Sequence, residues 1–204
     1  RRSFAGTYCG SLGGALGNYA IYLRGDNTGV FLGYLPGSST GLRNTGFSVT
    51  DLGTFQLTQG AVSVSGTIAE DGSITGLVSG VSGAVLTGTR SPDAGLAQSA
   101  AGAYQAAAAN TSSAVYGIVS ASGQAFVLVQ TSTTSDGGSG SLDGNNRMSI
   151  TTARQSIVAT IAPDTSGLTV VVTSGSTATT FTGASEAVLG AQRLANISTR
   201  ARVG

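Results

Sequence analysis

The sequence predicts an all-β protein built from two homologous antiparallel β units, each a sandwich or a small barrel. Short segments alternate β-branched or aromatic residues with polar ones, which is typical of half-buried strands. Turn signals rich in Gly, Asp and Asn separate these segments, and the whole pattern recurs along the 204 residues. Connections this short favour antiparallel pairing, because a parallel crossover needs about a dozen residues or more.

The recurrence indicates an internal duplication. The matched segments keep an offset of 93 to 96 residues, which chance similarity between low-complexity stretches would not preserve. We expect a superposition of residues 4–90 on 102–185 to bring Tyr8 onto Tyr104 and Leu86 onto Phe181. The matched pairs are "GTY" (6–8) with "GAY" (102–104), "AIY" (20–22) with "AVY" (114–116), "FQLT" (55–58) with "MSIT" (148–151), "TIAEDGSIT" (67–75) with "TIAPDTSGLT" (160–169), and "LTG" (86–88) with "FTG" (181–183).

The duplication divides the chain into four segments. We assign a first β repeat to 1–91, a short helical connector to 92–101, a second β repeat to 102–185 and a C-terminal tail to 186–204. Pro92 favours a helix start in the connector, because the fixed φ of proline suits the first helical turn.

Strands and tight turns follow one another within each repeat. Positive-φ positions in Asp-Gly and Asn-containing turns suit hairpins. The segments predicted as strands include 18–23, 29–35, 61–68, 84–89 and "QAAAAN" at 105–110. The predicted turns are Asp26-Asn27-Thr28-Gly29, Asp71-Gly72, Asp136-Gly137-Gly138 and Asp143-Gly144. A second short helix is predicted at 186–192, "EAVLGAQ".

The last twelve residues, "RLANISTRARVG" at 193–204, have no counterpart in the first repeat. They alternate like a half-buried strand, and the open edge of an antiparallel sheet accepts such a strand. We therefore predict that this tail pairs with a sheet edge of a neighbouring copy or, as the less favoured alternative, folds back on its own chain. The candidate pairing residues are Ala195, Ile197, Thr199, Arg200, Ala201, Arg202 and Val203.

Composition excludes many functions. Charged residues make up 9% and the net charge is +1, so no broad basic surface exists to attract nucleic acid. The chain has no histidine and no lysine, which removes His-based nucleophilic catalysis, His–metal sites and Schiff-base chemistry. No apolar run approaches the ~20 residues that span a bilayer. We expect no cofactor, no metal and no enzymatic activity, and the partners to be copies of the chain or neighbouring modules of a larger surface protein.

Three features of the sequence allow weaker alternatives. A carboxylate-based hydrolase would need a pair such as Glu70 and Asp71, but adjacent side chains in a hairpin turn diverge toward water. The segment "DGNN" from Asp143 lacks the regular carboxylate spacing of a calcium loop. Cys9 is the only cysteine and is expected to be a small buried hydrophobe, with an intermolecular disulfide as the alternative.

Tyr22, Arg24 and Tyr34 form the candidate ligand site of a second functional class, an adhesin or carbohydrate-binding module. Tyr22 and Tyr34 fall on neighbouring predicted strands, and tyrosine is the available stacking residue because the chain has no tryptophan. Burial as cross-strand core partners is the competing interpretation of these two residues. Arg24-Gly25-Asp26 matches a cell-adhesion tripeptide, although "RGDNTG" also suits an ordinary hairpin.

Four segments together resemble a known repeat: "FAGTYCGSL", "GTIAEDGSITG", "AGAYQAAAA" and "RLANISTRARVG". They are similar to a Gly/Ser/Thr-rich β repeat of very large secreted or cell-surface proteins of environmental bacteria, in which a segment N-[IL]-S-T-R-x-x-V-G often follows. The resemblance covers nearly the whole chain, and the N-I-S-T-R segment is its most specific part. It implies a secreted or cell-surface location and a structural or assembly role, and it supplies no catalytic residues.

Overall fold

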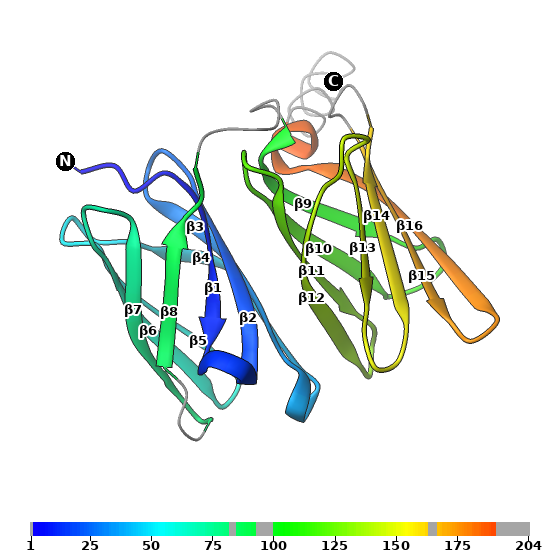
Figure 1. Ribbon diagram of the computed structural model, residues 1–204, viewed down its shortest axis with the longest axis horizontal. Coiled ribbons are helices and arrows are strands. Elements are labelled where there is room, and N and C mark those ends of the chain that lie inside the picture. Colours follow the sequence, from blue (N-terminus) through cyan, green and yellow to red (C-terminus); the bar gives the residue numbers. More distant parts are fainter. Residues whose placement is uncertain (1, 82–84, 93–99, 163–166, 191–204) are drawn as a thin grey trace, which may run out of the picture.

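The computed structural model describes residues 2–81, 85–92, 100–162 and 167–190. These residues form two eight-stranded antiparallel sheets that lie side by side (Figure 1). The first half of the chain forms one sheet and the second half forms the other. Each sheet curls until its two edge strands approach each other, so that each unit is nearly a closed barrel. The predicted all-β class with two homologous antiparallel units is confirmed.

The first sheet has the strand order β4-β3-β2-β1-β8-β7-β6-β5. It therefore consists of two four-stranded meanders joined by the pairing of β1 with β8. The turns η1 (Gly14–Leu16) and η2 (Pro36–Ser38) are short 3-10 helices. The strands are β1 (Gly6–Leu12), β2 (Gly17–Leu23), β3 (Thr28–Leu35), β4 (Thr40–Ser48), β5 (Thr54–Gln59), β6 (Val62–Ile68), β7 (Ser73–Ser79) and β8 (Val85–Arg90).

The second sheet repeats this order as β12-β11-β10-β9-β16-β15-β14-β13. A short helix begins at Glu186 directly after the last strand and is described as far as Gly190. The Oγ of Ser185 accepts a hydrogen bond from the N–H of Val188, which is an N-terminal cap. The strands are β9 (Gly102–Ala107), β10 (Ala114–Val119), β11 (Gln124–Gln130), β12 (Ser135–Ser141), β13 (Arg147–Thr151), β14 (Ser156–Ile161), β15 (Leu168–Ser174) and β16 (Thr177–Ser185).

Matched details of register confirm the duplication. The hydroxyl of Tyr8 donates to the carbonyl oxygen of Phe4 at 2.7 Å, and the hydroxyl of Tyr104 donates to that of Ala100 at 2.6 Å. Two residues before each tyrosine stands a glycine with positive φ, at 136° for Gly6 and 141° for Gly102. The opening strands of the two halves therefore enter their barrels through the same local structure.

One matched pair of the sequence alignment is shifted in the structure. Tyr8 pairs with Ile21, whereas Tyr104 pairs with Gly117, so Tyr22 corresponds to Ile118 and not to Tyr116. The offset on these strands is 96 residues, as for the opening strand. A shift of two residues leaves each side chain on the same face of a strand, so the alternation of "AIY" and "AVY" could not reveal it.

The predicted turn at Asp136-Gly137-Gly138 is wrong, because these residues lie in β12. The actual β11–β12 turn is built by Thr131, whose Oγ1 accepts hydrogen bonds from the N–H groups of Thr133 and Thr134. A threonine thus supplies the acceptor that aspartate supplies in the turns with Asp26, Asp71 and Asp143. Asp136 itself points into the barrel and is buried.

Two further sequence predictions can be compared with the structure, and two lie outside the described residues. The strand predicted at 105–110 is correct for residues 105–107, which belong to β9. The helix predicted at 186–192 starts where expected. Most of the predicted helical connector lies at 93–99, outside the described residues, and so does the tail 193–204.

Each barrel has its own apolar interior. In the first unit, the rings of Tyr19 and Phe31 stack at 5.3 Å between centroids, and Phe47 on β4 contacts Phe55 on β5 at 5.6 Å. The second contact joins the two edge strands of the sheet, and it therefore helps to close the barrel. The interior of the second unit is built mainly from smaller aliphatic side chains.

Candidate functional site: a cleft between the two units

The two barrels pack against each other through their outer surfaces. A third apolar cluster joins Val30 and Leu32 on β3 to Phe126 and Leu128 on β11. The strand registers make Val30 equivalent to Phe126, and Leu32 equivalent to Leu128. The contact is therefore isologous in character, since corresponding faces of the two repeats meet, as in a two-fold symmetric dimer.

Polar contacts fix the interface at both ends of this cluster. At one end, Arg24 donates from Nε at 2.9 Å, and from Nη2, to the carboxylate of Glu186. At the other, Arg154 Nη2 donates to the hydroxyl of Tyr34 at 3.3 Å and to the carbonyl oxygen of Ser135. The backbone of Gly41 lies close to the side chain of Ser135 there, because a Cβ at Gly41 would lie 2.8 Å from the Oγ of Ser135.

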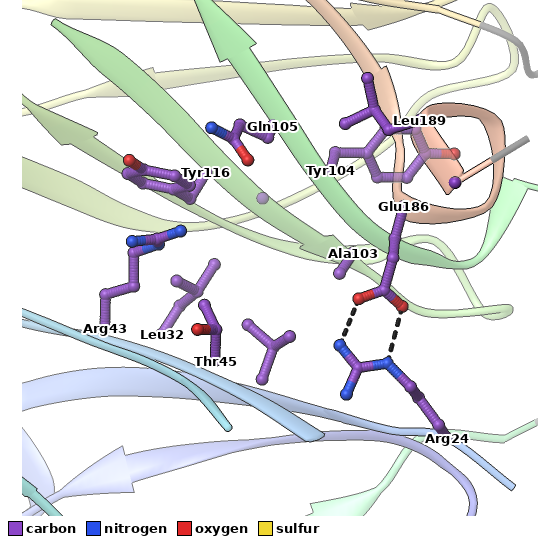
Figure 2. Close-up of a pocket in the computed structure, with 13 residues that line it drawn as sticks. Arg24, Leu32, Arg43, Thr45, Ala103, Tyr104, Gln105, Tyr116, Glu186 and Leu189 are labelled. Atoms are coloured by element: carbon purple, nitrogen blue, oxygen red, sulfur yellow. Dashed lines mark hydrogen bonds and ion pairs between the residues drawn. The ribbon is translucent and has the colours of Figure 1, made fainter. Parts of the chain in front are cut away.

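A cleft of about 340 Å³ opens beside the Arg24–Glu186 pair, between the two barrels (Figure 2). Arg24 in the β2–β3 turn and strands β3 and β4 form one wall, and β9, β10 and the helix that starts at Glu186 form the other. Its volume falls within the range of small-molecule sites in proteins. The lining residues are Arg24, Val30, Leu32, Arg43, Thr45, Ala103, Tyr104, Gln105, Tyr116, Gly117, Glu186, Leu189 and Gly190.

Arg43 is the most unusual residue of the cleft. Its guanidinium carbon lies 3.9 Å from the centre of the Tyr116 ring, which places a cation over an aromatic face. Its Nε atom is buried and has no hydrogen-bond partner among the described residues. A buried donor without a partner costs roughly 1–3 kcal/mol. Among the described residues, the hydroxyl of Tyr19 in the first barrel is the other buried side-chain atom without a partner.

A bulge in β4 shapes the wall next to Arg43. Gly29 pairs with Phe47 but Phe31 pairs with Asn44, so β4 carries one extra residue around Thr45. The Oδ1 of Asn44 accepts a hydrogen bond from the N–H of Gly46 at 3.1 Å and holds the bulge. The corresponding stretch of β11 and β12 pairs without interruption, so the bulge distinguishes the first repeat from the second. Bulges often re-aim side chains next to functional sites.

The structure separates the predicted ligand residues. Arg24 lines the cleft, and its pKa is raised chiefly by its hydrogen bonds to Glu186. Tyr22 pairs with Val30, whereas Tyr34 pairs with Asn18 at the opposite end of β2 and β3. Tyr34 is buried and bonded by Arg154. Tyr22 and Tyr34 share one face of the sheet but do not form one platform.

Arg24 and Asp26 of the Arg24-Gly25-Asp26 tripeptide make different contacts. Arg24 is held by Glu186, while Asp26 Oδ1 accepts hydrogen bonds from the N–H and the hydroxyl of Thr28. These hydrogen bonds to the Thr28 hydroxyl and amide lower the pKa of Asp26. The tripeptide therefore builds the β2–β3 turn and one end of the interface.

The other singled-out polar residues lie in ordinary turns. Glu70 and Asp71 are exposed between β6 and β7, and hydrogen bonds from the hydroxyl and amide of Ser73 lower the pKa of Asp71. Asp143 Oδ1 accepts from the backbone amides of Asn145 and Arg147. No group of three or more potential metal ligands occurs among the residues that the structure describes.

Cys9 is half-buried on the outer face of β1, at the margin of the apolar cluster between the units. The hydroxyl of Ser91 lies 3.9 Å from its sulfur and 3.1 Å from Oε1 of Gln124 in the second unit. Burial raises the pKa of the Cys9 thiol, which keeps it protonated at neutral pH. Packing of Cys9 against its neighbours agrees with its expected role as a small hydrophobe.

Sequence reasoning missed Arg43, Gln105, Tyr116 and Glu186. One signal for the interface was present, since β3 reads "TGVFLGYL" and β11 reads "QAFVLVQ", nearly continuous apolar runs that indicate burial on both faces. The candidate pairing residues of the tail, from Ala195 to Val203, lie outside the described residues.

Comparisons with protein-family models, curated proteins and solved structures found no match. The resemblance to a bacterial surface repeat therefore stays a prediction. Within the described residues, no helix has both the length and the apolar character needed to cross a bilayer. Fold and site together define a duplicated all-β protein, in which two eight-stranded barrels share a buried interface with a polar cleft at one end.

Proposed function

We propose that this chain is a non-catalytic structural module of a secreted or cell-surface bacterial protein, and that it assembles with copies of itself or with neighbouring modules. The interface between the repeats carries the proposal. Equivalent outer faces bury Val30 and Leu32 against Phe126 and Leu128, and polar contacts lock both ends. Two barrels joined in this way form a stiff body, which suits a spacer or building block.

The outer surfaces of the barrels also suit a structural role. Along one row of the first sheet, Thr54, Thr67, Thr75 and Thr87 lie opposite one another on adjacent strands, and all four are exposed. Uncharged hydroxyl-bearing surfaces of this kind remain hydrated without strong charge repulsion between copies. They are compatible with close side-by-side packing of modules.

The tail 193–204 is the proposed assembly strand. Its alternation predicts pairing with the sheet edge of another copy, with Arg200 and Arg202 on the polar face. Acidic turns such as the one with Glu70 and Asp71 would then face these arginines, with a gain of only about 0–1 kcal/mol per exposed ion pair.

Truncation tests the proposal. We expect the full chain at neutral pH to form particles or fibres in negative-stain electron micrographs, and a chain that lacks residues 194–204 to remain folded and monomeric by sedimentation. A matched variant with Arg200→Ser and Arg202→Ser keeps the strand pattern and should still assemble. A full chain that stays monomeric, or a truncated chain that assembles equally well, would contradict the proposal.

The alternative function, an adhesin or carbohydrate-binding module that uses Tyr22, Arg24 and Tyr34, loses its common platform because the two tyrosines lie apart. One observation still favours ligand binding as a second function. The cleft beside Arg24 brings together Arg43, Tyr116 and the side-chain amide of Gln105, which no sequence pattern had grouped.

A further inference from the structure

We propose that the cleft between the barrels binds the carboxylate of an acidic sugar, a uronate residue, with Arg43 as the anchoring cation. This inference goes beyond the structural role proposed above and is independent of it, because it rests on the walls of the cleft alone. Figure 2 shows the two sides of the site: Arg43 and Tyr116 lie on one side, and the Arg24–Glu186 pair on the other.

The charges of the cleft select a monoanion. Arg24 and Arg43 contribute two positive charges and Glu186 one negative charge, which leaves +1 among the described lining residues. Arg24 is already neutralised, since Nε and Nη2 bond Glu186 and Nη1 bonds the hydroxyl of Thr28. Arg43 makes no such ion pair with a described residue. A single carboxylate balances this net charge of +1, whereas a phosphate dianion would leave the cleft with an excess negative charge.

The geometry of Arg43 suits a carboxylate. A guanidinium presents parallel N–H donors that match the two oxygens of a carboxylate. Stacking on Tyr116 fixes the plane of the group before any ligand binds, which reduces the ordering cost of binding. Because Nε is buried, the donors that reach a ligand in the cleft are the terminal Nη groups of Arg43, and no described residue accepts a hydrogen bond from them.

The neighbouring groups suit sugar hydroxyls. Gln105 lies opposite Tyr116 on the adjacent strand and is exposed, and no described residue hydrogen-bonds its side-chain amide. The bulge in β4 brings the exposed hydroxyl of Thr45 to the same cleft. An amide and a hydroxyl both donate and accept, as the ring hydroxyls of a sugar require. Val30, Leu32 and Ala103 supply an apolar floor for the C–H face of the ring.

Titration by calorimetry or NMR tests this site with glucuronate and a short glucuronan oligomer as probes. Glucose and a neutral glucan of the same length serve as matched controls. We expect saturable binding of the acidic probes that weakens with added salt, and no saturable binding of the neutral ones. If neither glucuronate nor the glucuronan oligomer binds saturably, the proposal is overturned. Equal binding of neutral and acidic probes would also overturn it.

Three variants locate the site. Arg43→Gln should weaken uronate binding by about tenfold or more, because a charge-assisted hydrogen bond is lost. Gln105→Ala, at an exposed position that leaves the fold intact, should weaken binding by several-fold. Arg147→Gln removes an exposed cation on β13, away from the cleft, and should leave uronate binding unchanged. Unchanged affinity in both Arg43→Gln and Gln105→Ala, or an equal loss in Arg147→Gln, would place binding elsewhere and reject the cleft.

Discussion

The two repeats share one topology but fill their barrels differently. Among the described residues, six buried aromatic side chains occupy the interior cluster of the first unit, and two occupy that of the second. Equivalent positions change from Tyr19 to Val115, from Phe31 to Val127, from Phe47 to Gly140, and from Phe55 to Met148. Both units nevertheless have the same strand order and the same opening tyrosine contact.

This difference shows what determines the architecture. Strand register, positive-φ turn positions and the alternation of buried and exposed residues are common to the repeats, whereas core volume is not. A barrel of this kind tolerates large changes of side-chain size when facing residues change together, as other protein cores do. Substitutions at equivalent positions in the two units test that conclusion.

A buried charge distinguishes the units most sharply. Leu42 in the first unit corresponds to Asp136 in the second, where the carboxylate accepts hydrogen bonds from Thr152 Oγ1 at 2.6 Å and from the N–H of Gly137 at 3.0 Å. We expect Leu42→Asp to lower the free energy of unfolding by about 5 kcal/mol, because an unpaired charge would be buried. Asp136→Leu should cost much less. Chemical denaturation of both variants measures the difference, and equal losses would contradict the comparison.

The aromatic core gives the second test. Phe31 is fully buried and stacked on Tyr19, so Phe31→Ala is expected to cost about 4 kcal/mol. Val127→Ala at the equivalent position removes fewer carbon atoms than Phe31→Ala and should cost about 2 kcal/mol. Urea unfolding, followed by the change in the midpoint, checks both values. A larger loss from Val127→Ala would show that the second unit is the more tightly packed one.

The opening tyrosines should behave alike, in contrast to the cores. Tyr8→Phe and Tyr104→Phe each remove one buried hydrogen bond to a carbonyl oxygen, and each should cost about 1 kcal/mol. Thermal unfolding of the two single variants and of the double variant measures these costs and their additivity. Losses that differ by more than about twofold would mean that the shared contact has different roles in the two repeats.

Alkaline pH tests the burial of the same two tyrosines. Burial raises the pKa of Tyr104 from 10.0 to about 12 and also raises the pKa of Tyr8. Because the pKa is higher in the folded state than in the unfolded state, the contribution of the buried hydroxyl to the free energy of unfolding is fully present below about pH 10 and falls as the pH rises toward 12. Tyr104→Phe should show a shallower loss between pH 10 and 12 than the parent chain. Identical pH profiles would contradict the assigned burial effect.

The sequence was informative where the signal is local. Period-two alternation located strands such as 18–23 and 61–68 within one or two residues, because side-chain direction in a strand depends only on parity. Asp71-Gly72 identified a true hairpin, since Gly72 has a φ of 86°. Asp136 misled the turn assignment, because an aspartate that is hydrogen-bonded inside a barrel has the same local sequence as one in a turn.

The candidate site was not predictable from the sequence in the same way. Arg43 and Tyr116 are far apart in the chain, and they meet only because two outer faces pack in one particular register. The pairing of Arg24 with Glu186 depends on the same packing. Tertiary contacts of this kind leave no periodic signal, and only the doubly apolar strands β3 and β11 pointed to a covered outer face.

The central claim is that the two repeats form one rigid body through equivalent faces. A pulsed electron paramagnetic resonance measurement tests it directly, with spin labels at Gln56→Cys and Thr180→Cys in a Cys9→Ser background. Both label sites are exposed and lie on different barrels, on strands β5 and β16. We predict one narrow distance distribution that broadens when Phe126→Asp disrupts the interface. A broad distribution in the parent chain, unchanged by Phe126→Asp, would contradict the claim.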